Sequence, residues 1–201
     1  MFGLEFLQRA ILYGPVILFS LTVHEFFHAW TAYRFGDSTA ARMGRLTLNP
    51  LAHLDLFGTL MMVLSGFRLG WAKPVPVNPM NLRNPRVADI WISAAGPLSN
   101  LGMATLSGMF YRLTEGPEVL QQILIAMVVI NVTLAFFNLI PLFPLDGSHI
   151  LRNLLPAEYE AKLNRFDQYA PFVLLLVIVT GLFWRILGPI VMAVSTVLLG
   201  W

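Results

Sequence analysis

Long apolar runs place the strongest constraint on how this chain can fold. Residues 7–35, 87–111 and 119–140 are almost continuously apolar. Each run can cross a lipid bilayer, because a hydrocarbon core of ~30 Å takes about 20 helical residues. A helix also satisfies its own backbone N–H and C=O groups in hydrocarbon, whereas an open strand does not. These runs therefore predict an all-α, polytopic membrane protein.

The composition supports this class and argues against others. The 201 residues are 57% hydrophobic and only 12% charged, which is too little charge to cover the surface of a soluble domain. A net charge of +2, with no basic run, argues against a nucleic-acid partner. The chain has no cysteine, so any metal ion has to be bound by histidine and carboxylate side chains.

Shorter apolar segments complete the predicted architecture. Residues 56–66 are about half a span long and predict a re-entrant element that protein shields from lipid. Three prolines in residues 70–79 exclude a helix but allow an extended edge strand. Two further apolar runs, 171–184 and 186–201, are divided by Arg185. We therefore expect about five spans, with a re-entrant or β-like segment between the first and second.

We expect one domain, residues 1–201, with a core at about residues 7–155 and C-terminal helices at about residues 166–201. Basic residues gather in two loops, and cytoplasmic loops of membrane proteins carry an excess of Lys and Arg. These loops therefore predict an integral membrane protein with both loops in the cytoplasm and its N-terminus outside. The basic residues of the two loops are Arg34, Arg42, Arg45, Arg68, Lys73, Arg83, Arg86, Arg152, Lys162 and Arg165.

The first span carries the sequence His24-Glu25-Phe26-Phe27-His28. Histidines four residues apart lie on one face of a helix and can share a metal ion, and Glu25 can reach a metal-bound water without being a ligand. A lone intramembrane histidine would be interpreted as a satisfied core residue. Two histidines and a glutamate together favour a metal site, because each charged group placed in the membrane costs at least ~2.5 kcal/mol.

A catalytic zinc site has three protein ligands and one open position. Asp146 is the best candidate for the third ligand, because it follows the third span directly and Gly147 lets the backbone turn beside it. The alternative is that Asp146 caps a helix that starts there, and spacing alone leaves the two interpretations about even. The other candidates are His53, Asp55, Asp89 and His149.

Two motifs together resemble the signatures of the site-2 protease family of intramembrane zinc metalloproteases (peptidase family M50). They are the His24–His28 sequence and Pro-Leu-Phe-Pro-Leu-Asp-Gly at residues 141–147. Residues 44–50, 70–77 and 95–100 also resemble that family, so the likeness covers about residues 14–155. The resemblance implies that His24, His28 and Asp146 bind one Zn²⁺ and that Glu25 is the general base.

The resemblance also implies a function. It predicts an endopeptidase that hydrolyses peptide bonds within or near transmembrane segments of membrane proteins, in a prokaryotic plasma membrane with its active site towards the cytoplasm. The chain resembles minimal members, because it has no extra span before the histidine motif and no PDZ or CBS domain. The alternatives are a membrane metal or ion transporter, since intramembrane His and Asp also mark ion pathways, and a non-catalytic relative, which would typically have lost Glu25 or a ligand.

Three further polar residues have two interpretations each. Asn100 and Asn138 lie within or beside spans, where they either bond neighbouring helices or, for Asn100 above all, donate to the substrate carbonyl. His53 either supports or lines the entrance of the site, or is an ordinary interfacial residue. Residues 71–78 either pair as an edge strand with an unwound substrate or form a rigid surface loop.

Overall fold

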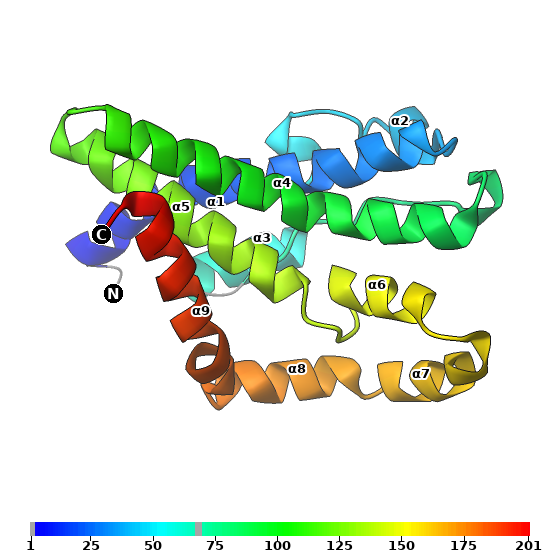
Figure 1. The fold of residues 1–201 in the computed structure, drawn as a ribbon. Helices are drawn as coiled ribbons and strands as arrows, with labels where there is room; N and C mark the ends of the chain where they lie inside the picture. The colour runs from blue at the N-terminus through cyan, green and yellow to red at the C-terminus, as the bar shows by residue number, and fades with distance from the viewer. Residues whose placement is uncertain (1–2, 67–69) are drawn as a thin grey trace.

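The computed structural model describes residues 3–66 and 70–201, and its architecture is helical (Figure 1). Arg68, one of the predicted cytoplasmic cations, lies outside these ranges. The long helices are α1 (Leu4–Arg34), α4 (Pro85–Leu113), α5 (Glu118–Asn138) and α9 (Leu182–Leu199). The shorter ones are α2 (Thr39–Arg42), α3 (Leu56–Leu64), α6 (Asp146–Leu154), α7 (Glu160–Asp167) and α8 (Ala170–Val179), with 3-10 turns η1 (Pro50–Ala52), η2 (Pro79–Asn81) and η3 (Ala157–Tyr159).

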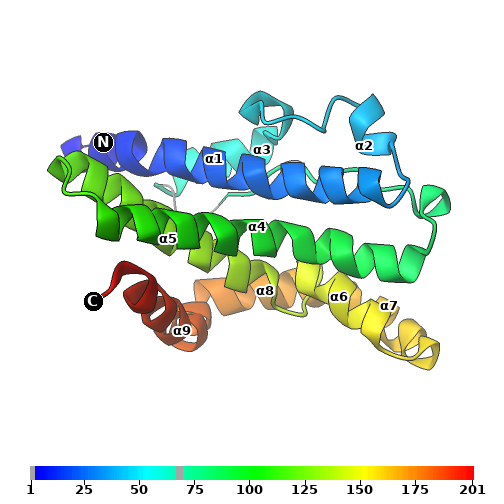
Figure 2. The ribbon, with the colours of Figure 1, turned by 45° about the horizontal axis from the view of Figure 1, so that its top comes forward.

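Helix α4 is the centre of the arrangement. It packs against α1, α5, α6 and α9, and α5 also contacts α1 and α9 (Figure 2). One buried cluster lies where α4, α5 and α9 meet, and a second joins α1 to the beginning of α4. The first cluster contains Ala104, Val128, Val132, Val191 and Leu199, and the second contains Ala32, Leu82, Ala88 and Ile92.

Three of the described helices are long and apolar enough to cross a membrane: residues Ala10–Arg34 of α1, the whole of α5, and α9. By their length and composition, these helices support an integral membrane protein. Helix α4 has 29 residues, but its Ser, Gly, Pro and Asn residues lower its mean hydropathy, and it is not among the candidate spans. Helix α8, with 10 residues, is too short to cross alone. The expected count of about five spans therefore stays a prediction.

The C-terminal apolar segment breaks at a different residue from the one expected. The predicted division at Arg185 is wrong, because Arg185 lies within α9. The break falls at Gly181, whose φ of +73° is left-handed. Glycine adopts this conformation without the steric cost that a side chain would add. A glycine therefore divides the two helices where a charged residue was expected to.

The segment between α1 and α4 is irregular. Helix α3 has 9 residues, or roughly 14 Å at 1.5 Å per residue, so it is too short to cross the membrane. The expected edge strand is reduced to one antiparallel bridge, between Leu54 and Ala72, and residues 3–66 and 70–201 contain no strand. Pro74 and Pro76 have no N–H to donate, which prevents the ladder from continuing.

Parts of both arginine-rich loops lie at the same end of the molecule. Figures 1 and 2 show α2, the beginning of α4 and α7 at one end, and the N-terminus, the α4–α5 turn and the C-terminus towards the other. Parts of both loops that the basic residues assign to one side of the membrane are therefore at one end of the fold, while α3, within the first loop, lies nearer the middle.

Candidate metal centre

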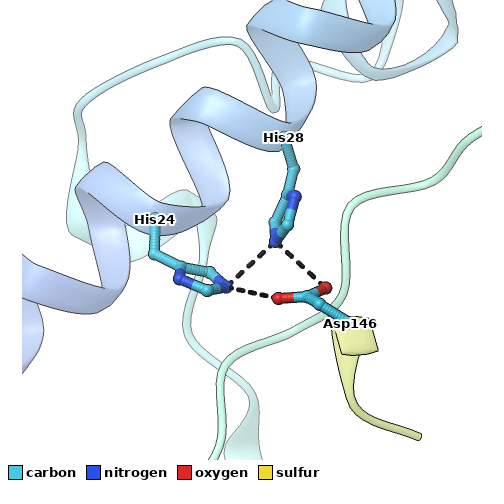
Figure 3. Close-up of side chains that lie close together, drawn as sticks. All are labelled: His24, His28 and Asp146. Atoms are coloured by element: carbon cyan, nitrogen blue, oxygen red, sulfur yellow. Dashed lines mark hydrogen bonds and ion pairs between the residues drawn. The ribbon is translucent and has the colours of Figure 1, made fainter. Parts of the chain in front are cut away.

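Three ligand-type side chains converge between α1 and α6 (Figure 3). His24 and His28 project from α1, and Asp146 is the first residue of α6. The Nε2 atom of His24 lies 3.3 Å from Asp146 Oδ2, and that of His28 lies 3.4 Å from Asp146 Oδ1. In the described part of the chain, this is the one group of three His, Asp or Glu residues whose ligand atoms all lie within 4.8 Å of one another.

Hydrogen bonds fix the orientation of both imidazoles. Nδ1 of His28 lies 2.6 Å from the backbone carbonyl of Ile92, and Nδ1 of His24 lies 2.6 Å from Oδ1 of Asn100. An oxygen of this kind only accepts, so each Nδ1 carries the proton and donates it. In the neutral rings, the Nε2 atoms then keep lone pairs that point into the cluster, as metal-ligating histidines require.

The orientation of the Asn100 amide follows from a backbone group on a third helix. Asn131 on α5 donates from Nδ2 to the Met127 carbonyl and to the Ser20 hydroxyl. Its Oδ1 therefore accepts, and it does so from Nδ2 of Asn100 at 2.8 Å. The Oδ1 of Asn100 is thereby turned towards His24. This buried chain across α5, α4 and α1 fixes the tautomer of His24.

The cluster fits a cation. The two Nε2 atoms lie 2.9 Å apart, although their Nδ1 partners leave both with lone pairs. Oδ2 of Asp146 is buried without a hydrogen-bond partner. Nitrogen lone pairs and carboxylate oxygens facing one another in a buried site repel unless a positive charge lies between them. Two imidazoles and one carboxylate are a known ligand set of catalytic zinc, which keeps its fourth position open.

The beginning of α6 places Asp146 in the cluster. The N-cap residue of α6 is Leu145, and no side chain caps the helix, so the alternative interpretation of Asp146 as the cap is wrong. Gly147 packs against the end of α5, where an added Cβ would lie 2.3 Å from the Leu139 carbonyl oxygen. This glycine lets α6 start directly against α5, which brings Asp146 towards the histidines.

Glu25 follows His24 on α1 and is 9% exposed. Its carboxylate acts electrostatically on Arg45, in the loop after α2: burial lowers the pKa of the Arg45 guanidinium, and the charge of Glu25 opposes that shift. Arg45 also donates to the carbonyls of Lys73 and Pro74. The loop after α2 and residues 73–74 are therefore tied together near Glu25.

The other candidate ligands lie outside the cluster. His53 is 2% exposed and bonds the Thr47 carbonyl through Nε2, while Asp55 caps α3 by accepting from the Gly58 N–H. Asp89 pairs with His149 at 3.3 Å. None of these four belongs to the group that can hold the ion, so their assignment as the third ligand is not supported.

The two asparagines differ in their surroundings. The hydrogen bonds of Asn100 join α1, α4 and α5, as the interhelical interpretation expected. Asn138, at the end of α5, donates to the Leu134 carbonyl one turn earlier. A substrate-binding role stays a prediction for both.

One pair of contributors to the site was not identified from the sequence: Asn131 with Ser20. Asn131 interrupts an apolar run, and a polar residue in a span signals an internal partner, so that signal was available. The sequence marks Gly96 as a small residue that lets helices approach closely, but it does not show that the imidazoles of His24 and His28 lie against it.

The fold and the cluster define the class of a helical membrane protein with a candidate metal centre. Residues 113–181 match the model of Peptidase family M50. The chain is 41% identical over 186 residues to "Putative zinc metalloprotease YwhC" of Bacillus subtilis, covering 88% of this chain and 84% of that protein. The chain therefore belongs to peptidase family M50, the site-2 protease family, and is a zinc metalloprotease.

Two more distant relatives are longer than this chain. "Putative zinc metalloprotease Rip2" of Mycobacterium tuberculosis H37Rv is 36% identical over 165 residues, which cover 79% of this chain and 62% of that protein. "Zinc metalloprotease MJ0392" of Methanocaldococcus jannaschii is 26% identical over 163 residues, which cover 78% of this chain and 39% of that protein. No solved structure matches the chain.

Proposed function

We propose that this protein is an intramembrane endopeptidase that hydrolyses peptide bonds within or near transmembrane segments of membrane proteins. The observation that carries the proposal is the depth of the ligand cluster. His24 lies ten residues before the end of the candidate span Ala10–Arg34, or roughly 15 Å along the helix. A site at that depth is suited to substrates that are themselves in the membrane.

The proposed chemistry assigns a role to each residue. His24, His28 and Asp146 would hold one zinc ion, which supplies a Lewis acid that polarises a carbonyl and lowers the pKa of water. Glu25 takes a proton from the attacking water and later gives it to the leaving amine. Asn100 and the Ile92 carbonyl keep the two imidazoles in the protonation state that ligation needs.

A helical substrate has to unwind locally, because its own hydrogen bonds shield its peptide groups. Residues 70–78 support this step in the proposal, since they are extended and Arg45 ties them to the loop near Glu25. Two parts of this step stay predictions. One is that the unwound substrate pairs with residues 70–78, and the other is that His53, whose carbonyl accepts from the Lys73 N–H, lines the entrance.

We also propose the location and extent of the enzyme. Parts of both basic loops lie at one end of the fold, which supports a site that opens towards the cytoplasm of a prokaryotic cell. Residues 1–201 would form a single metalloprotease domain.

Cleavage of a transmembrane reporter by the purified full chain tests this function. We expect cleavage that a zinc chelator abolishes and that Glu25→Gln reduces by at least about 100-fold, the lower range for a general base, without loss of bound zinc. Cleavage that survives both the chelator and the substitution would contradict the proposal. Metal flux into proteoliposomes without cleavage would favour the transporter instead.

A further inference from the structure

Helix α6 is short, and its first residue is a predicted metal ligand. Nine residues provide only about two and a half turns, so contacts elsewhere on the helix have to hold its beginning in place. Polar contacts of this kind run from His149 to the end of the helix. His149, Asn153 and the last carbonyls of the segment have their partners on α4, which itself supplies no ligand to the cluster.

One carboxylate of α4 receives two side chains of α6. Oδ2 of Asp89 accepts from Nδ2 of Asn153 at 2.6 Å and pairs with Nδ1 of His149 at 3.3 Å. Asn153 also donates to the His149 carbonyl one turn earlier. His149 lies three residues after Asp146, so this pairing is held less than one helical turn from the ligand.

A guanidinium of α4 holds the end of α6. Nε of Arg86 donates to the Asn153 carbonyl at 2.7 Å, and its terminal nitrogen donates to the Leu155 carbonyl. The last carbonyls of a helix have no partner within the helix, and a basic side chain there is favourable for both hydrogen bonding and the helix dipole. Arg86 therefore fixes the position of α6 along α4.

The same helix orients both histidines. Residues 89, 92, 96 and 100 of α4 follow each other at intervals of three or four, so they form one stripe along the helix. Asp89 bonds α6, the Ile92 carbonyl accepts from His28, and Asn100 accepts from His24. Gly96, between them, lets α4 approach the imidazoles closely.

We propose that Asp89 and Arg86 are positioning residues that hold Asp146 at ligand distance from the histidines, so that α4 sets the geometry of all three zinc ligands. This inference rests on the metal site of the proposed function and does not depend on the identity of the substrate. The contacts border a cavity of about 470 Å³, and the side chain of Asp89 is 31% exposed. Its removal therefore leaves no void in a packed interior.

Zinc affinity tests the proposal without relying on proteolysis. In the purified full chain, the zinc dissociation constant is measured by competition with a chromophoric chelator, beside the Tm and helical circular dichroism of the zinc-free protein. We expect Asp89→Ala to raise the dissociation constant about 10-fold, the lower range for groups that orient ligands. Asn153→Ala should have a similar effect. The variant that combines Asp89→Ala with Asn153→Ala should bind zinc no more weakly than whichever single variant binds it less tightly, because both substitutions remove the same hydrogen bond.

Asp167→Ala is the matched control. This carboxylate also binds α6, through Arg152, but it belongs to α7. We expect its zinc affinity to equal that of the wild type. An unchanged dissociation constant in Asp89→Ala, or an equal loss in Asp167→Ala, would overturn the proposal. If the wild type binds zinc but does not cleave the reporter, the proposed function fails while the positioning role of Asp89 can still be measured.

Discussion

At the scale of the residue, Gly96 shows how closely α4 shapes the metal centre. A Cβ atom on Gly96 would lie 2.5 Å from Nε2 of both His24 and His28, a separation that unshifted neighbours cannot accept. These nitrogens are the proposed ligand atoms, so a side chain at this position would push them out of the geometry that zinc needs. The smallest residue is required here because metal ligands lie against the helix.

We therefore expect Gly96→Ala to lower zinc affinity by at least about 10-fold and to abolish reporter cleavage, while the protein stays folded. Gly102→Ala is the control: it is on the same helix, and an added Cβ there meets nothing within 4 Å. It should retain both zinc and activity, as judged by metal content and cleavage rate. Equal behaviour of the two variants would show that the backbone approach at Gly96 is unimportant.

At the scale of the element, Asp37 joins the end of α1 to the segment before α4. Its carboxylate is fully buried and accepts from the Thr39 N–H, from Nδ2 of Asn81 and from the Asn78 N–H. Burial alone would raise the pKa of this carboxyl, but the hydrogen bonds together hold the pKa below its ordinary value of 3.8. The ionised form is therefore the one that the fold stabilises.

Because the folded pKa of Asp37 is lowered, its contribution to stability is present above pH 3.8 and is lost as the pH falls through the folded pKa. We expect Asp37→Asn to lower Tm by about 4 °C or more at pH 7, if about 2 kcal/mol is lost with the charged acceptor. The difference from the wild type should shrink as the pH is lowered below 3.8. Thermal melts of both proteins in detergent measure this, and a difference that is constant with pH would contradict the assignment.

The predictability of the elements depended on whether the signal was local. His24 and His28 are four residues apart on one helix, and Asp146 follows a span, so short motifs identified the three side chains that the structure brings together. Gly181 was missed as the break before α9 because the neighbouring Arg185 carried the more obvious signal. The expected strand failed because Pro74 and Pro76 lack the N–H groups that a ladder requires.

At the scale of the whole molecule, the absence of cysteine from the chain makes the proposed orientation testable with single cysteines. Glu158 lies beside α7, and Glu115 lies in the α4–α5 turn at the other end of the fold; both are exposed. We expect a membrane-impermeant thiol reagent, applied to intact cells, to label Glu115→Cys and to spare Glu158→Cys until the cells are opened. The reverse pattern would place the basic loops outside the cytoplasm.

X-ray absorption at the zinc edge of the purified full chain tests the central claim most directly. One zinc ion per chain is expected, with two imidazole nitrogens and carboxylate or water oxygens at about 2.0–2.2 Å, and Asp146→Ala should lose the metal or change this coordination shell. A wild-type protein without stoichiometric zinc, or a spectrum that Asp146→Ala leaves unchanged, would contradict a metal centre built from His24, His28 and Asp146.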